Sequence, residues 1–280
     1  MGPEFGGVVF GMASAVTWGA ADFCGGLATR RSEVSGVLFV SQLAGSLLLI
    51  VPLWVWQEPI PSTGDMLWGV AGGACGVVGI TAFYIGLANG RMGIVAPIAA
   101  VVTAGLPVLV GTVLEGFPPV VKYFGFALGL TSIWLVSRSS DGMTARLEEV
   151  GLPILAGVAF AGFFIFLDQA ADASILWPLV AVRATSLLLI VLASLALRKR
   201  ILPSRDKLPL IALAGLLDTG GNLFYMLAAR AGRLDIAAVL ASLYPAATVI
   251  LARMILKELI NRWQMIGIIA ALGAVVMIAT

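Results

Sequence analysis

The sequence predicts an all-α membrane protein with ten transmembrane helices, arranged as two inverted five-helix repeats. The first observation is composition: the 280 residues are 60% hydrophobic and only 11% charged, whereas a soluble domain is roughly 25% charged. The second is that the charges cluster in short segments between apolar windows of about 20 residues, the length that crosses a ~30 Å hydrocarbon core. The third is that the two halves of the chain resemble each other.

The apolar windows are bounded by proline, glycine and charged residues, and they predict the helices in order. In the first half they lie near 5–28, 34–56, 66–88, 92–114 and 118–137. In the second half they lie near 151–171, 175–197, 208–229, 234–256 and 262–280. Helices are required because lipid cannot satisfy the backbone of an open strand. We therefore divide the chain into a first repeat at 1–137, a linker at 138–150 and a second repeat at 151–280.

The flanks of these windows agree with the division. The first window lacks a basic segment before it and is too long for the apolar region of a signal peptide, so it is expected to be a retained helix. Six of the seven tryptophans fall near predicted helix ends, where amphipathic rings favour the headgroup layer. These six are Trp54, Trp56, Trp68, Trp134, Trp177 and Trp263. Trp18 lies in mid-helix, which favours a packed or cavity-lining ring.

Comparison of the two halves reveals matches at a nearly constant offset of about 141 to 146 residues. The matched pairs are Phe83-Tyr84 with Phe224-Tyr225, Gly90-Arg91 with Gly232-Arg233, Gly125 with Gly267, Gln42 with Arg183, and Asp22 with Asp168. Each repeat has an odd number of helices, so the second repeat must enter the membrane from the opposite side. Inverted repeats are typical of transporters in which a site near the midplane faces each side in turn.

Several short motifs resemble those of a known family. They are Trp18-Gly19, the segment from Gly232 to Pro245, Leu256-Lys257-Glu258, and the segment from Gly267 to Gly273. Together with ten helices in two halves, they resemble the EamA family of the drug/metabolite transporter superfamily. The resemblance implies solute transport but not the solute. The first repeat departs from the pattern, because Thr103 stands near the place of Pro245 and no basic residue follows Glu115-Gly116.

Positive charge is distributed unevenly between the two sides of the predicted bundle. Loops on the amino-terminal side contain three basic residues, Lys122, Arg230 and Arg233. The opposite loops contain twelve: Arg30, Arg31, Arg91, Arg138, Arg146, Arg198, Lys199, Arg200, Arg205, Lys207, Lys257 and Arg262. The positive-inside rule makes the second side cytoplasmic and places both termini outside the cell (inner) membrane. The resemblance implies cytoplasmic termini for many relatives, and here the charge count predicts the reverse.

Ionisable residues at membrane depth are candidates for function because they are costly there. Asp218 lies near the middle of the eighth window, and Asn222 and Tyr225 follow on the same helical face. The matching stripe in the first repeat is Val77, Thr81 and Tyr84. We expect a substrate-binding cavity between the stripes, lined by Trp18, Thr81, Tyr84, Asp218, Asn222, Tyr225 and Tyr244. A buried ion pair of Asp218 with Arg183 or Arg253 is the structural alternative.

A second group suggests coupling or gating. Asp168 and Arg183 are predicted to lie near adjoining helix ends, where they could form an ion pair, and Asp22 and Gln42 are their counterparts. Such a pair could hold a gate closed and break during transport. A static link between helices explains it equally well.

The remaining sequence features narrow the function. There is no histidine, and the only cysteines, Cys24 and Cys75, lie inside apolar windows. We therefore expect no metal, no cofactor and no enzyme activity. The basic run Arg198-Lys199-Arg200 is interpreted as an anchor beside the membrane, not as a nucleic-acid site.

The predicted function is secondary active transport of a small organic solute in the lipid bilayer, driven by a gradient, exchange or coupled protons. Export of an amino acid, a related metabolite or a drug-like compound is expected, with Asp218 as the titrating group. A channel or a scaffolding membrane subunit is the alternative, followed by an intramembrane enzyme. The oligomeric state is not predicted.

Overall fold

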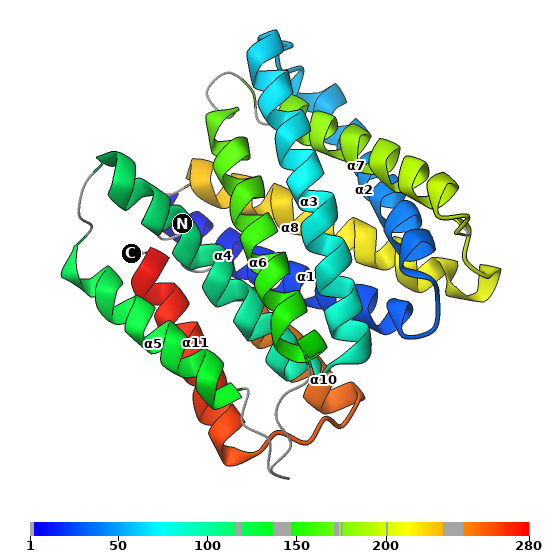
Figure 1. The fold of residues 1–280 in the computed structure, drawn as a ribbon. Helices are drawn as coiled ribbons and strands as arrows, with labels where there is room; N and C mark the ends of the chain where they lie inside the picture. The colour runs from blue at the N-terminus through cyan, green and yellow to red at the C-terminus, as the bar shows by residue number, and fades with distance from the viewer. Residues whose placement is uncertain are drawn as a thin grey trace.

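The structure is a computed structural model that describes residues 3–115, 119–136, 147–170, 174, 176–199, 201–231 and 243–279. These residues form ten α-helices, a short 3-10 helix and no strand (Figure 1). The first half contains α1 (Pro3–Thr29), α2 (Val34–Trp56), α3 (Thr63–Asn89), α4 (Met92–Glu115) and α5 (Val120–Val136). The second half contains α6 (Leu147–Gln169), α7 (Leu176–Ala196), η1 (Arg205–Lys207), α8 (Leu208–Ala231), α10 (Tyr244–Ile255) and α11 (Arg262–Ala279).

The predicted windows agree closely with these helices, with two differences. α6 begins at Leu147, so the end of the predicted linker is helical, while 138–146 lies outside the described residues. The ninth window is described only from Leu243 onward, and α10 carries Pro245 in its first turn. Proline is favoured there because the first backbone N–H groups of a helix have no partner within it. The earlier part of that window, 234–242, lies outside the described residues.

The surface of the helices is apolar. Six described helices, α1, α2, α3, α6, α7 and α8, are long and apolar enough to cross a membrane. The apolar stretches described in α4, α5, α10 and α11 are shorter. On α2, Leu47, Ile50 and Trp54 are exposed along one face, as Leu188, Leu192 and Leu195 are on α7. Outward-facing apolar stripes of this kind are typical of lipid contact, so the protein is a multi-pass membrane protein.

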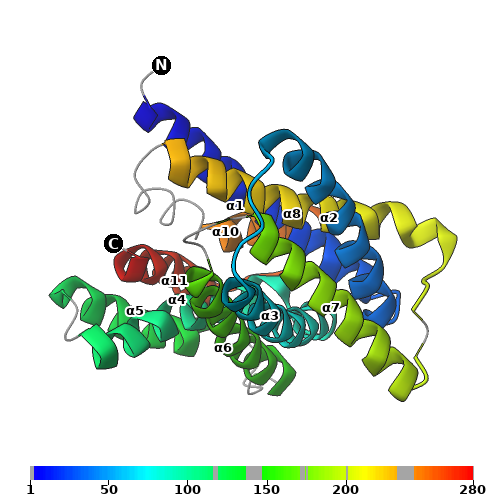
Figure 2. The same ribbon diagram turned by 90° about the horizontal axis from the view of Figure 1, so that it is seen from above.

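The helices pack in matched pairs across the two halves. α1 packs along α8 and α3 along α6, while α2 packs on α8 and α7 on α3. α5 and α11 lie side by side at one edge in both views (Figures 1 and 2). Not every pairing is matched. α1 also packs on α3 and α4 on α11, but their counterparts, α6 with α8 and α5 with α10, make no comparable contact among the described residues.

Two pairs of glycine contacts repeat at the offset found in the sequence. A Cβ on Gly73 of α3 would come 2.8 Å from the carbonyl oxygen of Val182, and one on Gly215 of α8 would overlap the carbonyl of Ser41. Likewise, the ring of Phe160 packs over Gly79 and the ring of Trp18 over Gly221. Glycine is needed at these positions because the facing groups occupy the space of a side chain.

Candidate functional site

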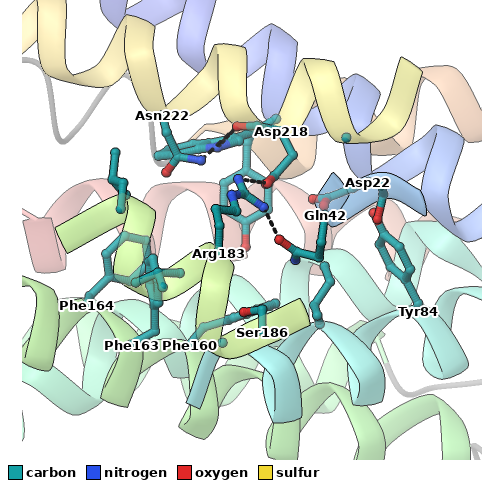
Figure 3. A pocket seen from close by; sticks show the side chains of 18 of the residues that line it. Asp22, Gln42, Tyr84, Phe160, Phe163, Phe164, Arg183, Ser186, Asp218 and Asn222 are labelled. Atoms are coloured by element: carbon teal, nitrogen blue, oxygen red, sulfur yellow. Dashed lines mark hydrogen bonds and ion pairs between the residues drawn. The ribbon is translucent and has the colours of Figure 1, made fainter. Parts of the chain in front are cut away.

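A cavity of about 140 Å³ lies between the two halves of the protein (Figure 3). Residues of α1, α2, α3 and α4 line one part of it, and residues of α6, α7, α8 and α10 line the rest. The lining residues are Trp18, Asp22, Ser41, Gln42, Gly76, Ile80, Tyr84, Thr103, Phe160, Phe163, Phe164, Leu179, Val182, Arg183, Ser186, Gly215, Asp218, Asn222 and Tyr244. The volume is close to that of a cavity that holds one benzene molecule, about 150 Å³.

Arg183 is at the centre of the polar contacts in this cavity. Its Nη2 lies 2.6 Å from Oδ2 of Asp218 and donates to Oγ1 of Thr219 at 3.0 Å. Its Nη1 donates to Oε1 of Gln42. The Arg183 side chain is 9% exposed and that of Asp218 is 38% exposed, so both line the cavity but the carboxylate is the more accessible partner. A nearly buried guanidinium is therefore held by α2 and α8 together.

The backbone of α8 beside this ion pair also accepts hydrogen bonds from side chains. The carbonyl oxygen of Asp218 accepts hydrogen bonds from Nε1 of Trp18, at 3.2 Å, and from Nδ2 of Asn222, at 2.8 Å. Trp18 also contacts Tyr225 and Tyr244, with ring centroids 5.9 and 6.4 Å apart. The indole thus fixes α1 against α8 while lining the cavity.

Asp22 and Tyr84 lie at one end of the cavity in Figure 3, with Phe163 and Phe164 toward the other end. Asp22 is partly buried and makes no ion pair or hydrogen bond within the described part of the chain, although the charge of Asp218 acts on it. The Tyr84 side chain is 2% exposed and packs over Gly25, where a Cβ would overlap its ring and hydroxyl. The absence of a side chain at Gly25 therefore makes room for this phenol.

The other end of the cavity is aromatic. Phe160, Phe163 and Phe164 of α6 all line it. The rings of Phe163 and Phe164 are 5.2 Å apart, and Phe160 lies 5.7 Å from the buried ring of Phe83. This end can take an apolar or aromatic group.

Most of the site residues predicted from the sequence line the cavity: Trp18, Asp22, Gln42, Tyr84, Arg183, Asp218, Asn222 and Tyr244. Two do not. The hydroxyl of Thr81 donates to the carbonyl of Val77 in its own helix at 2.6 Å, and Tyr225 packs on Trp18 behind the lining. The side chain of Asp168 lies outside the described residues. Among the described residues, Arg183 contacts Gln42, Asp218 and Thr219. The pair with Asp218 is one of the two ion pairs named as the structural alternative, whereas the contact with Thr219 was not expected.

Sequence reasoning missed the phenylalanines of α6 and Ser186, whose hydroxyl donates to the carbonyl of Gly73 at 3.4 Å. The repeat contained a usable signal for two of them, because at an offset of 142 residues Phe160 matches Trp18 and Phe164 matches Asp22, and both partners line the cavity. Phe163 has no such signal, since aromatic residues are also common where a helix faces lipid or core.

A second polar cluster joins four helices at the end of the molecule where α1 finishes. The Glu258 carboxylate accepts hydrogen bonds from the backbone N–H groups of Met92 and Gly93, both at 3.1 Å, at the start of α4. Arg30 donates to Glu258 at 3.3 Å and to the carbonyls of Leu87 and Gly90 at 3.3 and 3.2 Å. We call these two side chains with their partners the Glu258 clasp. The clasp connects the ends of α1, α3, α4 and α10.

The chain reaches the clasp through a turn after α10. Lys257 adopts a left-handed backbone, with φ 53°, and so redirects the chain at the end of the helix. The core nearest this end includes Leu87, Met92 and Val95, all 0% exposed. No group of three metal-ligating side chains is found in the part of the chain that the structure describes.

Comparison with known proteins agrees with this architecture. No curated protein matches the sequence. A solved structure titled "Crystal structure of protein" is similar with a TM-score of 0.65 and 15% identity, and the match covers 97% of this chain and 95% of that one. At that identity the likeness supports the fold alone. The model of the EamA-like transporter family matches residues 5–138 and again residues 149–280. The chain therefore belongs to the EamA-like transporter family, within the drug/metabolite transporter superfamily.

Proposed function

We propose that this protein is a secondary transporter that exports a small organic solute across the inner membrane by alternating access. The solute class comprises amino acids, related metabolites and drug-like compounds. The observation that carries the proposal is the cavity between the two halves, in which Gln42 of one half and Arg183 of the other meet directly. A cavity of ligand size that places a few charged and polar groups in a mainly apolar lining is typical of a binding site for a small solute.

The unequal packing of the two halves supports alternating access. The matched pairs α1 with α8 and α3 with α6 favour two inverted repeats, and the contacts of Gly73 and Gly215 repeat in the same way. α1 and α3 meet at the Glu258 clasp, whereas their counterparts α6 and α8 make no comparable contact in the described residues. We interpret this form as closed at the clasp. In the opposite form, α6 would pack on α8 and the clasp would open.

The charge distribution sets the proposed orientation. The clasp lies on the side that carries twelve of the loop cations, which we assign to the cytoplasm. Both termini are then outside, and the present form is closed toward the cytoplasm. Cysteines at Thr63 and Ser204, both exposed and on opposite sides, test this in a background without Cys24 and Cys75. A membrane-impermeant maleimide should label Thr63→Cys in intact cells and Ser204→Cys only after permeabilisation; the opposite pattern would reverse the orientation.

Uptake into proteoliposomes tests the transport proposal. A panel of radiolabelled amino acids, amines and neutral aromatic compounds is expected to include at least one solute with saturable uptake. Arg183→Met should abolish that uptake because it leaves Asp218 and Gln42 without their shared partner. Ser62→Ala, which changes an exposed helix cap outside the cavity, should not affect it. Uptake that never saturates for any solute would instead favour a channel.

A further inference from the structure

The charges that line the cavity do not balance. Within the part of the chain that the structure describes, three charged side chains line it: Asp22, Arg183 and Asp218. Arg183 is already in contact with Asp218, Thr219 and Gln42, so its positive charge is compensated by Asp218. Asp22 forms no ion pair among the described residues, and Asp218, which lines the same cavity, carries a charge of the same sign. The described lining therefore contains one acidic side chain more than its single cation can neutralise.

An uncompensated carboxylate inside a membrane protein is unfavourable, and membrane-insertion scales put its cost at roughly several kcal/mol. The groups around Asp22 do not remove this cost. Tyr84 and Tyr244 are neutral phenols on α3 and α10, Asp218 on α8 repels, and Arg183 on α7 is committed elsewhere. The Tyr84 phenol makes no hydrogen bond within the described residues, although the residue is 2% exposed and lines the cavity. Both side chains are thus open to a partner from outside the protein.

The rest of the cavity specifies the shape of that partner. Opposite Asp22 and Tyr84, the phenylalanines of α6 form an apolar wall (Figure 3). A volume near that of one benzene ring suits a solute with a single small ring or a short alkyl body. A carboxylate on the solute would find no free cation among the described lining residues, because Arg183 is engaged. The solute is therefore expected to carry a positive charge and no negative one.

We propose that Asp22 binds the ammonium group of the solute and that the solute is a small monoamine with an aromatic or alkyl body, which packs against Phe160, Phe163 and Phe164. Tyr84 contributes no charge, but its hydroxyl oxygen accepts a hydrogen bond from an N–H of the same ammonium group. This inference rests on the proposed transport function and narrows its solute class from amino acids and metabolites to cationic amines.

The test compares three probes of nearly equal size: phenethylamine, 2-phenylethanol and 3-phenylpropionate, which are cationic, neutral and anionic. Binding to the purified full-length protein in nanodiscs is measured by isothermal titration calorimetry. The wild type is expected to bind phenethylamine at least about tenfold more tightly than the neutral probe, with no detectable binding of the anion. Asp22→Asn should weaken phenethylamine binding by roughly thirtyfold or more. Asp22→Glu, which keeps the charge, should retain most of it.

Asp206→Asn is the matched control, because Asp206 is an exposed carboxylate in η1 outside the cavity lining, and it should bind phenethylamine as the wild type does. Asp22→Asn is expected to unfold at the same or a higher temperature than the wild type, since it removes an unpaired charge. If Asp22→Asn does not fold, two other results still decide the proposal. They are the phenethylamine affinity of Asp22→Glu relative to the wild type, and the order of the wild-type affinities for the three probes.

Wild-type affinity in Asp22→Asn would overturn the inference. So would tighter binding of the neutral or anionic probe, or no binding of phenethylamine at millimolar concentration. The proposed function fails differently. If saturable uptake of another solute persists while phenethylamine does not bind, the protein is a transporter and only the amine assignment is wrong. If no solute in the panel shows saturable uptake, the transport proposal itself is wrong.

Discussion

Replacing Glu258 with alanine is expected to open the end of the molecule that the Glu258 clasp holds closed. The carboxylate accepts two backbone N–H bonds at the start of α4, and its side chain is only 9% exposed. Hydrogen bonds to a charged group contribute about 1.5 to 3 kcal/mol each. A negative charge at a helix N-terminus adds up to about 2 kcal/mol in a partly buried site. Because these contributions overlap, we expect the variant to destabilise the closed form relative to the open form by about 3 kcal/mol. That difference corresponds to roughly a hundredfold increase in the open population.

The assay uses a buried reporter on the same side as the clasp. Ala28 on α1 is 2% exposed, so Ala28→Cys should react slowly with a maleimide once Cys24 and Cys75 have been replaced by alanine. If the clasp holds this end closed, labelling occurs through the open form, and Glu258→Ala should raise its rate by roughly a hundredfold. Glu258→Gln keeps one acceptor oxygen and should give a smaller increase.

Glu33→Ala is the control for this experiment. Glu33 lies near the same end of α1, and its exposed carboxylate makes no capping hydrogen bond. Its labelling rate should equal that of the parent. A rate in Glu258→Ala that is also unchanged, in a protein that remains folded, would refute the role assigned to the clasp.

Three further predictions concern stability and the cavity. Asp218→Ala should lower the free energy of unfolding by about 3 kcal/mol, because it leaves the more buried charge of Arg183 unpaired. Arg183→Met should lower it by about half as much, because the Asp218 carboxylate that it leaves unpaired is more exposed and better hydrated. Denaturation in detergent measures both losses, and equal losses would contradict this reasoning. Gly25→Ala should push the Tyr84 ring into the cavity and weaken solute binding severalfold. Gly64→Ala, whose new Cβ meets only Ser62 Oγ at 3.5 Å, should leave binding unchanged. Equal binding by both variants would count against the assignment of Tyr84 to the binding site. Ser62→Ala removes the capping box of α3 and should cost about 1 kcal/mol of stability without changing uptake; lost uptake would place this cap in the mechanism.

Much of the fold follows from the sequence for a simple physical reason. A membrane-spanning helix must be apolar over its whole length, so window boundaries such as 34–56 and 92–114 nearly coincide with α2 and α4. The position of Asp218 in the cavity was also predictable, because a carboxylate in mid-helix with Asn222 one turn later marks a polar face. The match between Gln42 and Arg183 indicated positions related by the repeat, and these two side chains touch in the structure.

Other parts of the site depend on contacts between distant segments, which periodicity does not reveal. Glu258 follows α10 but caps α4, more than a hundred residues earlier in the chain. The choice of Asp218 as the partner of Arg183 depends on how α7 lies against α8. Thr81 was assigned to the cavity because it shares a helical stripe with Tyr84, but its hydroxyl bonds its own helix. Spacing alone cannot separate these outcomes.

The most direct test of the central claim is counterflow in proteoliposomes. Vesicles that contain the protein are loaded with a high concentration of unlabelled solute and diluted into a trace of the labelled form. A carrier with one cavity that faces each side in turn predicts transient accumulation of label above its equilibrium level in the wild type, and none in Arg183→Met. Equilibration of the label without any overshoot, in vesicles that do show uptake, would contradict alternating access.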